Sequence, residues 1–461
     1  LAPGLVRDPG VRVSYSNYAT ALLGLIVEDV TGEPIEAYFR REIWRPLGMD
    51  SARFQRGLTL EPGTATAYSK QPSGAYEPDH FIAFNPLYWP VGAVSLTLDD
   101  AVRYARFHLE RARGVEGPVL SAAQHRRLTS VMRANHPDTG GFGFQIMSYE
   151  WNGRRLIGHG GTWVGYESML LVSPDDDMAL FFSIVGPRGM GNIEATRLLV
   201  PRLFCDDQPP RPAAAGTGVA LADYAGVYRP AMRTDTRAEG VLAYLGGGDA
   251  AVVEATPDGL MIAGDGPFKP VGDDLFFHAQ AKQTGANPFA MPRMAFYRDA
   301  DGKVAGLTSH LGFTPLERVG PLGDPRWAAS GLRWIGFALL LALPALFWPR
   351  RSVAELGVKA AALAPAACVF AIAPVLTMAM GPGGLGAYLI EGRTLRFAAA
   401  SALANLTVLC AVVLTIAATI WIRDGGRRPV WARAHLTLTA ALTCAASAIL
   451  IAVHLVGFGR A

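Results

Sequence analysis

The sequence predicts three regions in order: an α/β domain with an antiparallel sheet, a small all-β domain, and a four-helix transmembrane region. Three observations predict them. Residues 1–205 combine helical hydrophobic spacing with runs that alternate as strands. Residues 219–320 alternate short β-like runs with Gly/Asp turns, which is typical of an antiparallel β-domain. From residue 327 onward, long apolar runs without charge predict helices that span a membrane.

The first domain opens with helices. Asn17 suits an N-cap, and the next apolar residues recur with helical spacing. Gly32 is expected to end that helix, and Pro34 suits the first turn of the next. Thr97 with Asp100 three residues later resembles a capping box, which predicts a helix over 98–111.

Four strands are predicted in the second half of this domain. Short turns separate them, at 152–153, in a Gly-rich segment and at 174–177. Such turns join neighbouring antiparallel strands, so we expect a meander of four strands over 142–150, 154–158, 166–172 and 178–185. A helix over 193–204 is expected to close the domain, and residues 206–218 (DDQPPRPAAAGTG) have the composition of a linker.

The hydropathy of the chain points to a membrane. Half of the 461 residues are hydrophobic, and the mean hydropathy is +0.21. Uncharged runs cover 360–380, 397–422 and 436–453, and 327–348 is apolar except for Arg333. Because a spanning helix needs about 20 apolar residues, the sequence predicts four transmembrane helices, at about 327–348, 360–380, 397–422 and 434–457.

The charges of the tail predict its orientation. The formal net charge is +3, yet the part before Arg333 is mildly acidic, and the basic excess lies in the apolar tail. This distribution argues against a nucleic-acid partner, which needs a basic face on a folded domain. Arginine and lysine concentrate in the first and third tail loops, which predicts that those loops are cytoplasmic and the globular part is not.

The cysteines predict neither a metal site nor a disulfide framework. There are four, Cys205, Cys368, Cys410 and Cys444, and none pairs with metal-ligand spacing. We therefore expect no metal and no cofactor. The first residue is Leu1, and no signal peptide is visible.

Two short motifs could carry chemistry. Tyr15-Ser16-Asn17 precedes a helix, and His159-Gly160-Gly161-Thr162 is expected at the end of a strand, before a turn. Paired glycines at a strand end let another backbone approach closely. The histidine could hold a proton, and the Thr162 N–H could point at an oxyanion. Each motif alone is a weak indicator, because a lone histidine is more often structural than catalytic.

Together and in order, the motifs resemble a known superfamily. SYSNYATALLGLIVEDVTGEPIEAYFRREIWRPLGM (14–49) resembles the segment around the second motif of β-lactamase-related serine hydrolases, which include class C β-lactamases, penicillin-binding D-alanyl-D-alanine peptidases and esterases. PVGAVSLTLDDAVRYARF (90–107) and GHGGTWVGYESMLLVSPDDDMALFFSIV (158–185) resemble its later segments. LADYAGVYRP (221–230) resembles the start of a small β-domain that often follows.

The resemblance implies roles for the motif residues. Tyr15 would shuttle the proton, and Asn17 would hydrogen-bond the substrate amide or the missing lysine. His159 would take the position of the third-motif lysine. The glycines Gly160 and Gly161 would let substrate lie along the strand, and the Thr162 N–H would be one oxyanion donor. The resemblance thus implies a serine hydrolase that forms an acyl-enzyme on an ester, amide or β-lactam carbonyl. His-x-Gly favours an esterase or D-amino-acid peptidase over a β-lactamase.

One departure from the superfamily is plain. No serine in the chain has a lysine three positions later, so the Ser-x-x-Lys motif is absent. In the superfamily this motif precedes Tyr-x-Asn, so we expect an N-terminally truncated fragment that is inactive as it stands. A free phenol has a pKa of about 10 and needs nearby positive charge to act as a base at neutral pH. The missing lysine would supply most of it, and His159 only part.

Two other functions stay open at this point. The chain could be a non-catalytic, membrane-bound binding or sensing module on the same fold. The helices could themselves be a transporter, although their apolar cores hold no Asp or Glu for an ion path. The expected partners are a small-molecule or peptide substrate and the lipid bilayer, and no oligomeric state is predicted. The expected location is a bacterial inner membrane, crossed several times.

Overall fold

A computed structural model describes most of the chain. The residues described are 7–55, 60, 62–70, 73–78, 88–144, 146–151, 154–163, 165–186, 195, 199, 203, 220–232, 250–279, 293–309, 312, 314–347, 353–380, 395–423 and 428–452. They divide into two compact units. The sheet–barrel unit comprises Pro9–Met232 and Val252–Arg318, and the helical unit comprises Leu1–Asp8, Arg233–Ala251 and Val319–Ala461.

Helix α1 (Asn17–Thr31) is capped one residue earlier than predicted. The N-cap is Ser16, whose hydroxyl accepts a hydrogen bond from the Ala19 N–H. The prediction of Asn17 was wrong because both residues can cap, and the backbone is already helical at Asn17. Gly32 ends the helix as predicted, in the left-handed conformation (φ 71°). The apolar residues with helical spacing are exposed: Leu22, Leu23, Ile26 and Val30.

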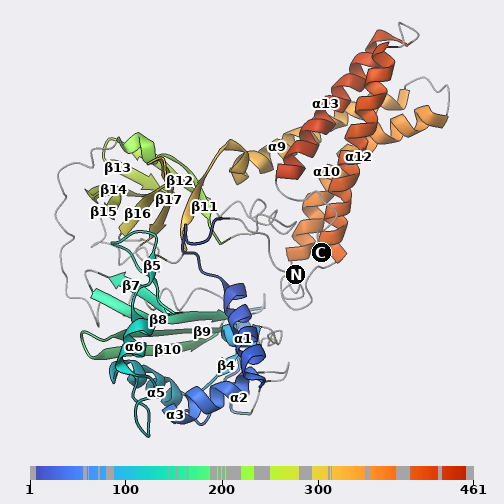
Figure 1. Cartoon of the computed structure of the whole chain (residues 1–461). Coiled ribbons are helices and arrows are strands. Elements are labelled where there is room, and N and C mark those ends of the chain that lie inside the picture. Colours follow the sequence, from blue (N-terminus) through green and yellow to red (C-terminus); the bar gives the residue numbers. More distant parts are fainter. Residues whose placement is uncertain are drawn as a thin grey trace. The chain divides into compact units, whose positions relative to one another are not determined.

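The elements that follow α1 form a mainly helical layer (Figure 1). It contains α2 (Ile35–Phe39), a π-helical turn (Arg40–Trp44), α3 (Arg45–Leu47), α4 (Trp89–Gly92), α5 (Leu98–Leu109) and α6 (Ala122–Thr129). Trp44, Phe54 and Phe107 lie in its buried core. Two small sheets complete this layer, formed by β1 (Arg53–Phe54) with β4 (Val94–Ser95) and by β2 (Tyr68–Lys70) with β3 (Tyr76–Pro78).

The main sheet has six strands in the order β10-β9-β8-β7-β6-β5, and its pairs are antiparallel. The strands are β5 (Arg133–Ala134), β6 (Gly141–Phe142), β7 (Met147–Trp151), β8 (Arg154–Trp163), β9 (Tyr166–Ser173) and β10 (Met178–Val185). The predicted strand over 142–150 is therefore two strands. Strand β8 runs on to Trp163, so the His-Gly-Gly-Thr motif lies inside it. The turn comes later, at Gly165 (φ 76°). The predicted helix over 193–204 lies largely outside the described residues.

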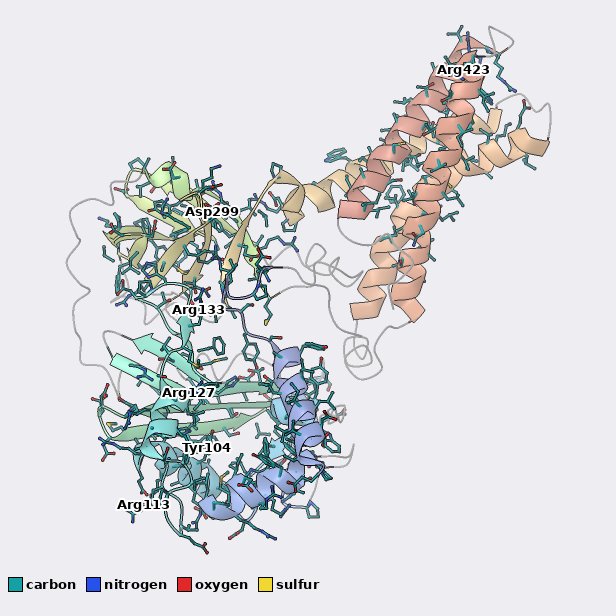
Figure 2. The ribbon with its side chains drawn as sticks, viewed as in Figure 1. Tyr104, Arg113, Arg127, Arg133, Asp299 and Arg423 are labelled. Atoms are coloured by element: carbon teal, nitrogen blue, oxygen red, sulfur yellow. The ribbon has the colours of Figure 1, made fainter. Side chains whose placement is uncertain are left out.

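A buried histidine pair joins α5 to α6. His108 Nδ1 and His125 Nε2 are 3.4 Å apart, and both side chains are buried. The ring of Tyr104 stands edge-on to His108 with centroids 5.0 Å apart, and Figure 2 labels this tyrosine within the helical layer. Burial, with a smaller effect of His125, lowers the pKa of His108 from 6.5 to about 4.

We expect this pair to make the sheet–barrel unit sensitive to acid. Because the folded pKa of His108 is lowered from 6.5 to about 4, the unfolded chain takes up the proton first as the pH falls. The neutral, buried His108 therefore contributes its full share to the free energy of unfolding above pH 6.5. This contribution is lost as the pH falls toward 4. It amounts to about 3 kcal/mol. Urea unfolding at pH 7 and pH 4.5 measures how much the free energy of unfolding falls between these pH values. This fall should be smaller for His108→Gln than for the unchanged chain. The same loss in both chains would contradict this, and His136→Gln, at a half-buried histidine outside this pair, is the control.

Eight strands in the later part of the sheet–barrel unit close into a barrel (Figure 1). After a 3-10 turn (Leu221–Tyr224) come β11 (Gly226–Pro230), β12 (Ala251–Thr256), β13 (Gly259–Ile262), β14 (Asp265–Gly272), β15 (Leu275–His278), β16 (Arg293–Arg298), β17 (Val304–Ser309) and β18 (Leu316–Val319). Its core is aromatic, with Tyr224, Tyr228, Phe268, Phe276 and Phe296 each almost fully buried. The barrel and the main sheet belong to one compact unit, so the predicted domain boundaries stay predictions.

The helical unit contains α9 (Pro325–Leu339), α10 (Val353–Met380), α12 (Leu395–Arg423) and α13 (Val430–Ala452). Three segments are long and apolar enough to span a membrane: Glu355–Ile372, Ala399–Arg423 and Val430–Ile451. The prediction of four is not confirmed. The first predicted span stops being α-helical at Leu339 and continues as a 3-10 helix (Leu340–Phe347) that contains Pro344. Proline has no N–H for an α-helical bond, which leaves a shorter apolar helix, Trp334–Ala345.

Candidate active site

Tyr15 lies directly before the N-cap of α1. Its ring stacks on Phe142 of β6 with centroids 6.3 Å apart and packs on a buried cluster of the main sheet that includes Tyr149. The Ser16 hydroxyl is engaged in the helix cap, so it does not resemble an activated nucleophile. Tyr15 is thus held between the helix and the sheet and stays partly exposed.

The structure brings the first residues of the two motifs together. The ring centroids of Tyr15 and His159 are 5.7 Å apart, although 143 residues separate them in the chain. Asn17 is the first residue of α1, and Thr162 follows three residues after His159 on β8. Both are exposed. The contact between the rings of Tyr15 and His159 is therefore the geometric centre of the candidate site.

The His159 ring contacts the backbone of the next residue. Its Nδ1 lies 2.5 Å from the Gly160 carbonyl oxygen. Because a carbonyl only accepts, Nδ1 carries the proton and donates, and Nε2 is the basic nitrogen. Desolvation lowers the pKa of His159, and the bond to Gly160 offsets this only in part. The lowered pKa of His159 disfavours the charged ring, so His159 contributes less positive charge to Tyr15 than the motif alone suggests.

The phenols of the site are poor bases. Burial raises the pKa of Tyr15. Burial, and then the neighbouring Tyr15, raises the pKa of Tyr149. Two phenols that disfavour ionisation cannot take a proton from a serine at neutral pH without a cation beside them. A proton-accepting role for Tyr15 therefore needs a positive group that Tyr149 and His159 do not provide.

The site lies where strand pairing changes. Pairs between β8 and β7 end at Gly158 with Met147, whereas pairs between β8 and β9 continue to Trp163 with Tyr166. Gly158 (φ 155°) approaches β9 so closely that a Cβ there would collide with the Leu170 carbonyl oxygen. The glycine next to His159 is thus required by sheet packing.

Sequence reasoning missed three residues near Tyr15. Phe142 and Tyr149 lie in a predicted strand, and their aromatic character was the only available indication. Asn135 hydrogen-bonds the backbone of Val13, two residues before Tyr15, and nothing in the sequence marks it. Among the described residues no group of three or more His, Cys, Asp or Glu could hold a metal ion. The three described cysteines, Cys368, Cys410 and Cys444, are free.

Comparisons with known proteins identify the first part of the chain. Residues 1–198 match the family model described as Beta-lactamase. Penicillin-binding protein 4 of Amycolatopsis lactamdurans is 26% identical over 250 residues, which cover 48% of this chain and 60% of that protein. A D-aminopeptidase of Gluconobacter oxydans is 26% identical over 162 residues, 35% of this chain and 29% of that protein. The chain thus spans 60% and 29% of the lengths of these two relatives.

Solved structures were also compared. The crystal structure of SurE is 21% identical with a TM-score of 0.44, covering 68% of this chain and 70% of that one. A D-stereospecific amidohydrolase from Streptomyces is 22% identical with a TM-score of 0.35, covering 43% of this chain and 56% of that one. The family model and the curated relatives define a class, the serine hydrolases that are related to β-lactamases. Residues 1–198 belong to the β-lactamase and penicillin-binding-protein superfamily.

Proposed function

We propose that this chain belongs to a membrane-anchored serine hydrolase that acts through an acyl-enzyme. The observation that carries the proposal is the approach of Tyr15 to His159, with ring centroids 5.7 Å apart. These 461 residues contain no Ser-x-x-Lys motif, so they do not supply the nucleophilic serine in that form. Covalent labelling by a fluorophosphonate, with and without a Ser-x-x-Lys segment ahead of Leu1, tests the proposal.

In this proposal each motif residue has one task. Tyr15 passes the serine proton to the leaving group, once a lysine beside it favours the phenolate. His159, neutral and with Nε2 available as the basic nitrogen, accepts a hydrogen bond from the substrate or from Tyr15. Asn17 holds the substrate amide. The Gly160-Gly161 pair leaves space along β8, and the Thr162 N–H donates to the oxyanion.

We propose a D-amino-acid amide or ester as the substrate class. The support is the D-aminopeptidase of Gluconobacter oxydans among the relatives and the His-x-Gly form of the third motif. An imidazole in place of a lysine also leaves the site without a permanent positive charge at neutral pH. Such a site favours amide or ester substrates that have no carboxylate to pair with a cation there.

A second function is a non-catalytic binding module on the same fold. One observation favours it: burial raises the pKa of Tyr15, so the described site holds a phenol that stays protonated at neutral pH. Such a phenol and a neutral imidazole can recognise a ligand by hydrogen bonds without reacting with it. Labelling separates the two functions, because binding alone leaves no covalent adduct.

We propose that the helical unit crosses the membrane four times, with the sheet–barrel unit outside the cytoplasm and residues 219–320 as a small β-domain of their own. One end of the bundle supports this orientation. Glu355 in the first turn of α10 pairs with Arg428, which precedes α13, at 2.5 Å. The Arg428 guanidinium lies 4.3 Å from the Trp421 ring near the end of α12. The first and third loops, which are rich in arginine, therefore lie at the same end.

A reporter should locate that end. Alkaline phosphatase or green fluorescent protein fused within residues 424–432 is expected to behave as cytoplasmic: fluorescent, and without phosphatase activity. The reason is the preference of arginine-rich loops for the cytoplasmic side. The same fusions within residues 381–394 are the matched control and should behave oppositely. Phosphatase activity at 424–432 would reverse the proposed topology.

A further inference from the structure

The segment before Tyr15 is held by a side chain that imitates a strand partner. The Asn135 Oδ1 accepts from the Val13 N–H at 3.0 Å, and the Asn135 Nδ2 donates to the Val13 carbonyl at 2.8 Å. One amide thus satisfies both backbone groups of Val13. Arg133, on edge strand β5, donates to the Gly10 carbonyl oxygen. Figure 2 labels Arg133 between the main sheet and the barrel.

The same amide reaches the barrel. Asn135 Nδ2 also donates to the Gly312 carbonyl at 3.2 Å. Gly312 has φ 74° and packs so tightly that a Cβ there would collide with the Gly140 carbonyl oxygen. Only glycine allows this approach. The backbone at Gly312, between β17 and β18, thus lies against both Gly140 and Asn135.

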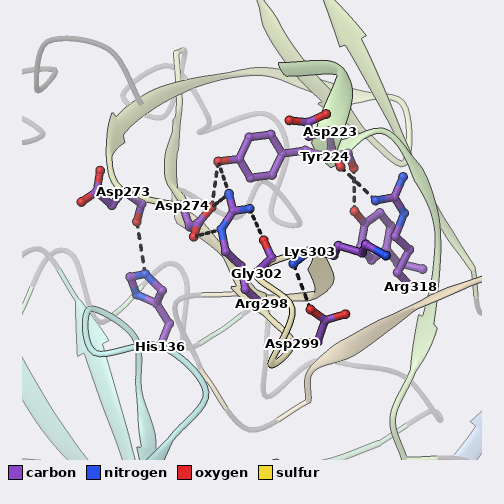
Figure 3. A network of polar contacts seen from close by, with 11 residues as sticks. His136, Asp223, Tyr224, Asp273, Asp274, Arg298, Asp299, Gly302, Lys303 and Arg318 are labelled. Atoms are coloured by element: carbon purple, nitrogen blue, oxygen red, sulfur yellow. Dashed lines mark hydrogen bonds and ion pairs between the residues drawn. The ribbon is translucent and has the colours of Figure 1, made fainter. Parts of the chain in front are cut away.

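Arg12 gives a second attachment next to Val13. Its guanidinium lies 4.1 Å from the Tyr297 ring centroid, and Nη2 donates to the Arg298 carbonyl at 3.5 Å. Arg298 has partners of its own: Asp274 accepts from it at 2.8 and 2.6 Å. Figure 3 shows this pair with Tyr224. The partner of Arg12 is thus part of an ordered polar network in the barrel.

The loop after Asn135 touches the barrel independently of Val13. His136 Nε2 lies 3.4 Å from the Asp273 carbonyl oxygen, as Figure 3 shows. Arg293 donates to the Asp138 carbonyl at 3.1 Å. Contacts that only dock the loop on the barrel are therefore separable from the contact that also holds Val13.

We propose that Asn135 is a positioning residue that ties the Arg12–Val13 segment to the barrel and so sets the place of the Tyr15 phenol beside His159. Tyr15 follows Val13 by two positions, roughly 7 Å of extended chain. On the other side, the Ser16 cap fixes Tyr15 to α1. Tyr15 is thus held from both directions. The assignment rests on the proposed function for its meaning, and its geometry can be tested separately.

The test is a histidine titration of the full chain in detergent. The chain has nine histidines, so ¹³Cε1-histidine labelling gives few signals, and His159→Gln assigns the one required. In the unchanged chain the pKa of His159 is lowered by desolvation, and Tyr15 is one of the rings that covers it. Asn135→Ala should release Tyr15 and raise the midpoint toward the ordinary value of about 6.5. His136→Ala, the neighbouring barrel contact, should leave the midpoint unchanged.

Each outcome decides the matter. An unchanged His159 midpoint in folded Asn135→Ala would overturn the proposal, and so would an equal rise in His136→Ala, which would indicate general loosening. If Asn135→Ala does not fold, Asn135→Gln gives the readout, since its longer amide should displace Val13 and raise the midpoint. The titration needs no nucleophile, so it stands even if the hydrolase proposal fails. In a chain that acylates, Asn135→Ala should slow labelling about 10- to 100-fold, whereas His136→Ala should not.

Discussion

A chain of these 461 residues is expected to show no covalent labelling by fluorescent penicillin or by a fluorophosphonate. An acyl-enzyme needs a hydroxyl beside an amine and opposite oxyanion donors. The chain supplies Tyr15, Asn17, His159 and the Thr162 amide, but no Ser-x-x-Lys. Gel fluorescence after incubation with each probe measures the outcome. Stoichiometric labelling would show that another serine is the nucleophile and would overturn the roles proposed for these residues.

The positive arm uses a longer chain with a Ser-x-x-Lys segment ahead of Leu1. It should be labelled, and changing its serine to alanine should abolish labelling. Tyr15→Phe should slow labelling by about 10²- to 10⁴-fold, the range for loss of a general acid–base group. Tyr149→Phe is the matched control, because this second phenol is buried in the sheet and bonded to the Met147 sulfur at 3.2 Å. Equal slowing by both changes would contradict a special role for Tyr15.

Gly158→Ala should destabilise the sheet–barrel unit by about 3 kcal/mol or more, the upper range for overpacking a core. The new Cβ would collide with the Leu170 backbone, which cannot move without breaking the pairs between β8 and β9. The change also displaces the next residue, His159. Urea unfolding followed by circular dichroism gives the change in unfolding free energy.

Gly161→Ala is the matched control on the same strand. Among the described residues, its Cβ would meet the Ser168 hydroxyl oxygen, at 2.9 Å, and this side chain can change its rotamer. We expect a loss of about 1 kcal/mol or less at this position. If both changes cost the same, the close approach at Gly158 is not the reason for glycine there.

The sequence was most informative where a local pattern decides the structure. Helix α1 ends at Gly32 and the strands β9 and β10 lie where alternation and turns predicted them. The pairing of Tyr15 with His159 could be expected only through the order of motifs in the superfamily, because no local rule brings together residues so far apart in the chain.

Other features depend on competition that a local pattern does not resolve. Ser16 and Asn17 are both good caps, and their order in the chain does not decide between them. Pro344 changes the type of helix inside an apolar run whose composition alone predicts a full span. Desolvation lowers the pKa of His159, and this effect depends on neighbours from distant segments. Asn135 acts through backbone groups, and backbone partners leave no trace in residue type.

The Asn135 contact also bears on how the protein folds. It joins Asn135 to Val13, 122 positions away in the chain, and to Gly312, 177 positions away. Contacts of such long range form late, because the intervening chain must first lose its freedom. Tyr15 is synthesised before Asn135 and before Gly312, the two residues on which we propose that its place depends. We therefore expect the site to become ordered only in the last step of folding, after the barrel has closed, so that partly made chains carry no preformed site.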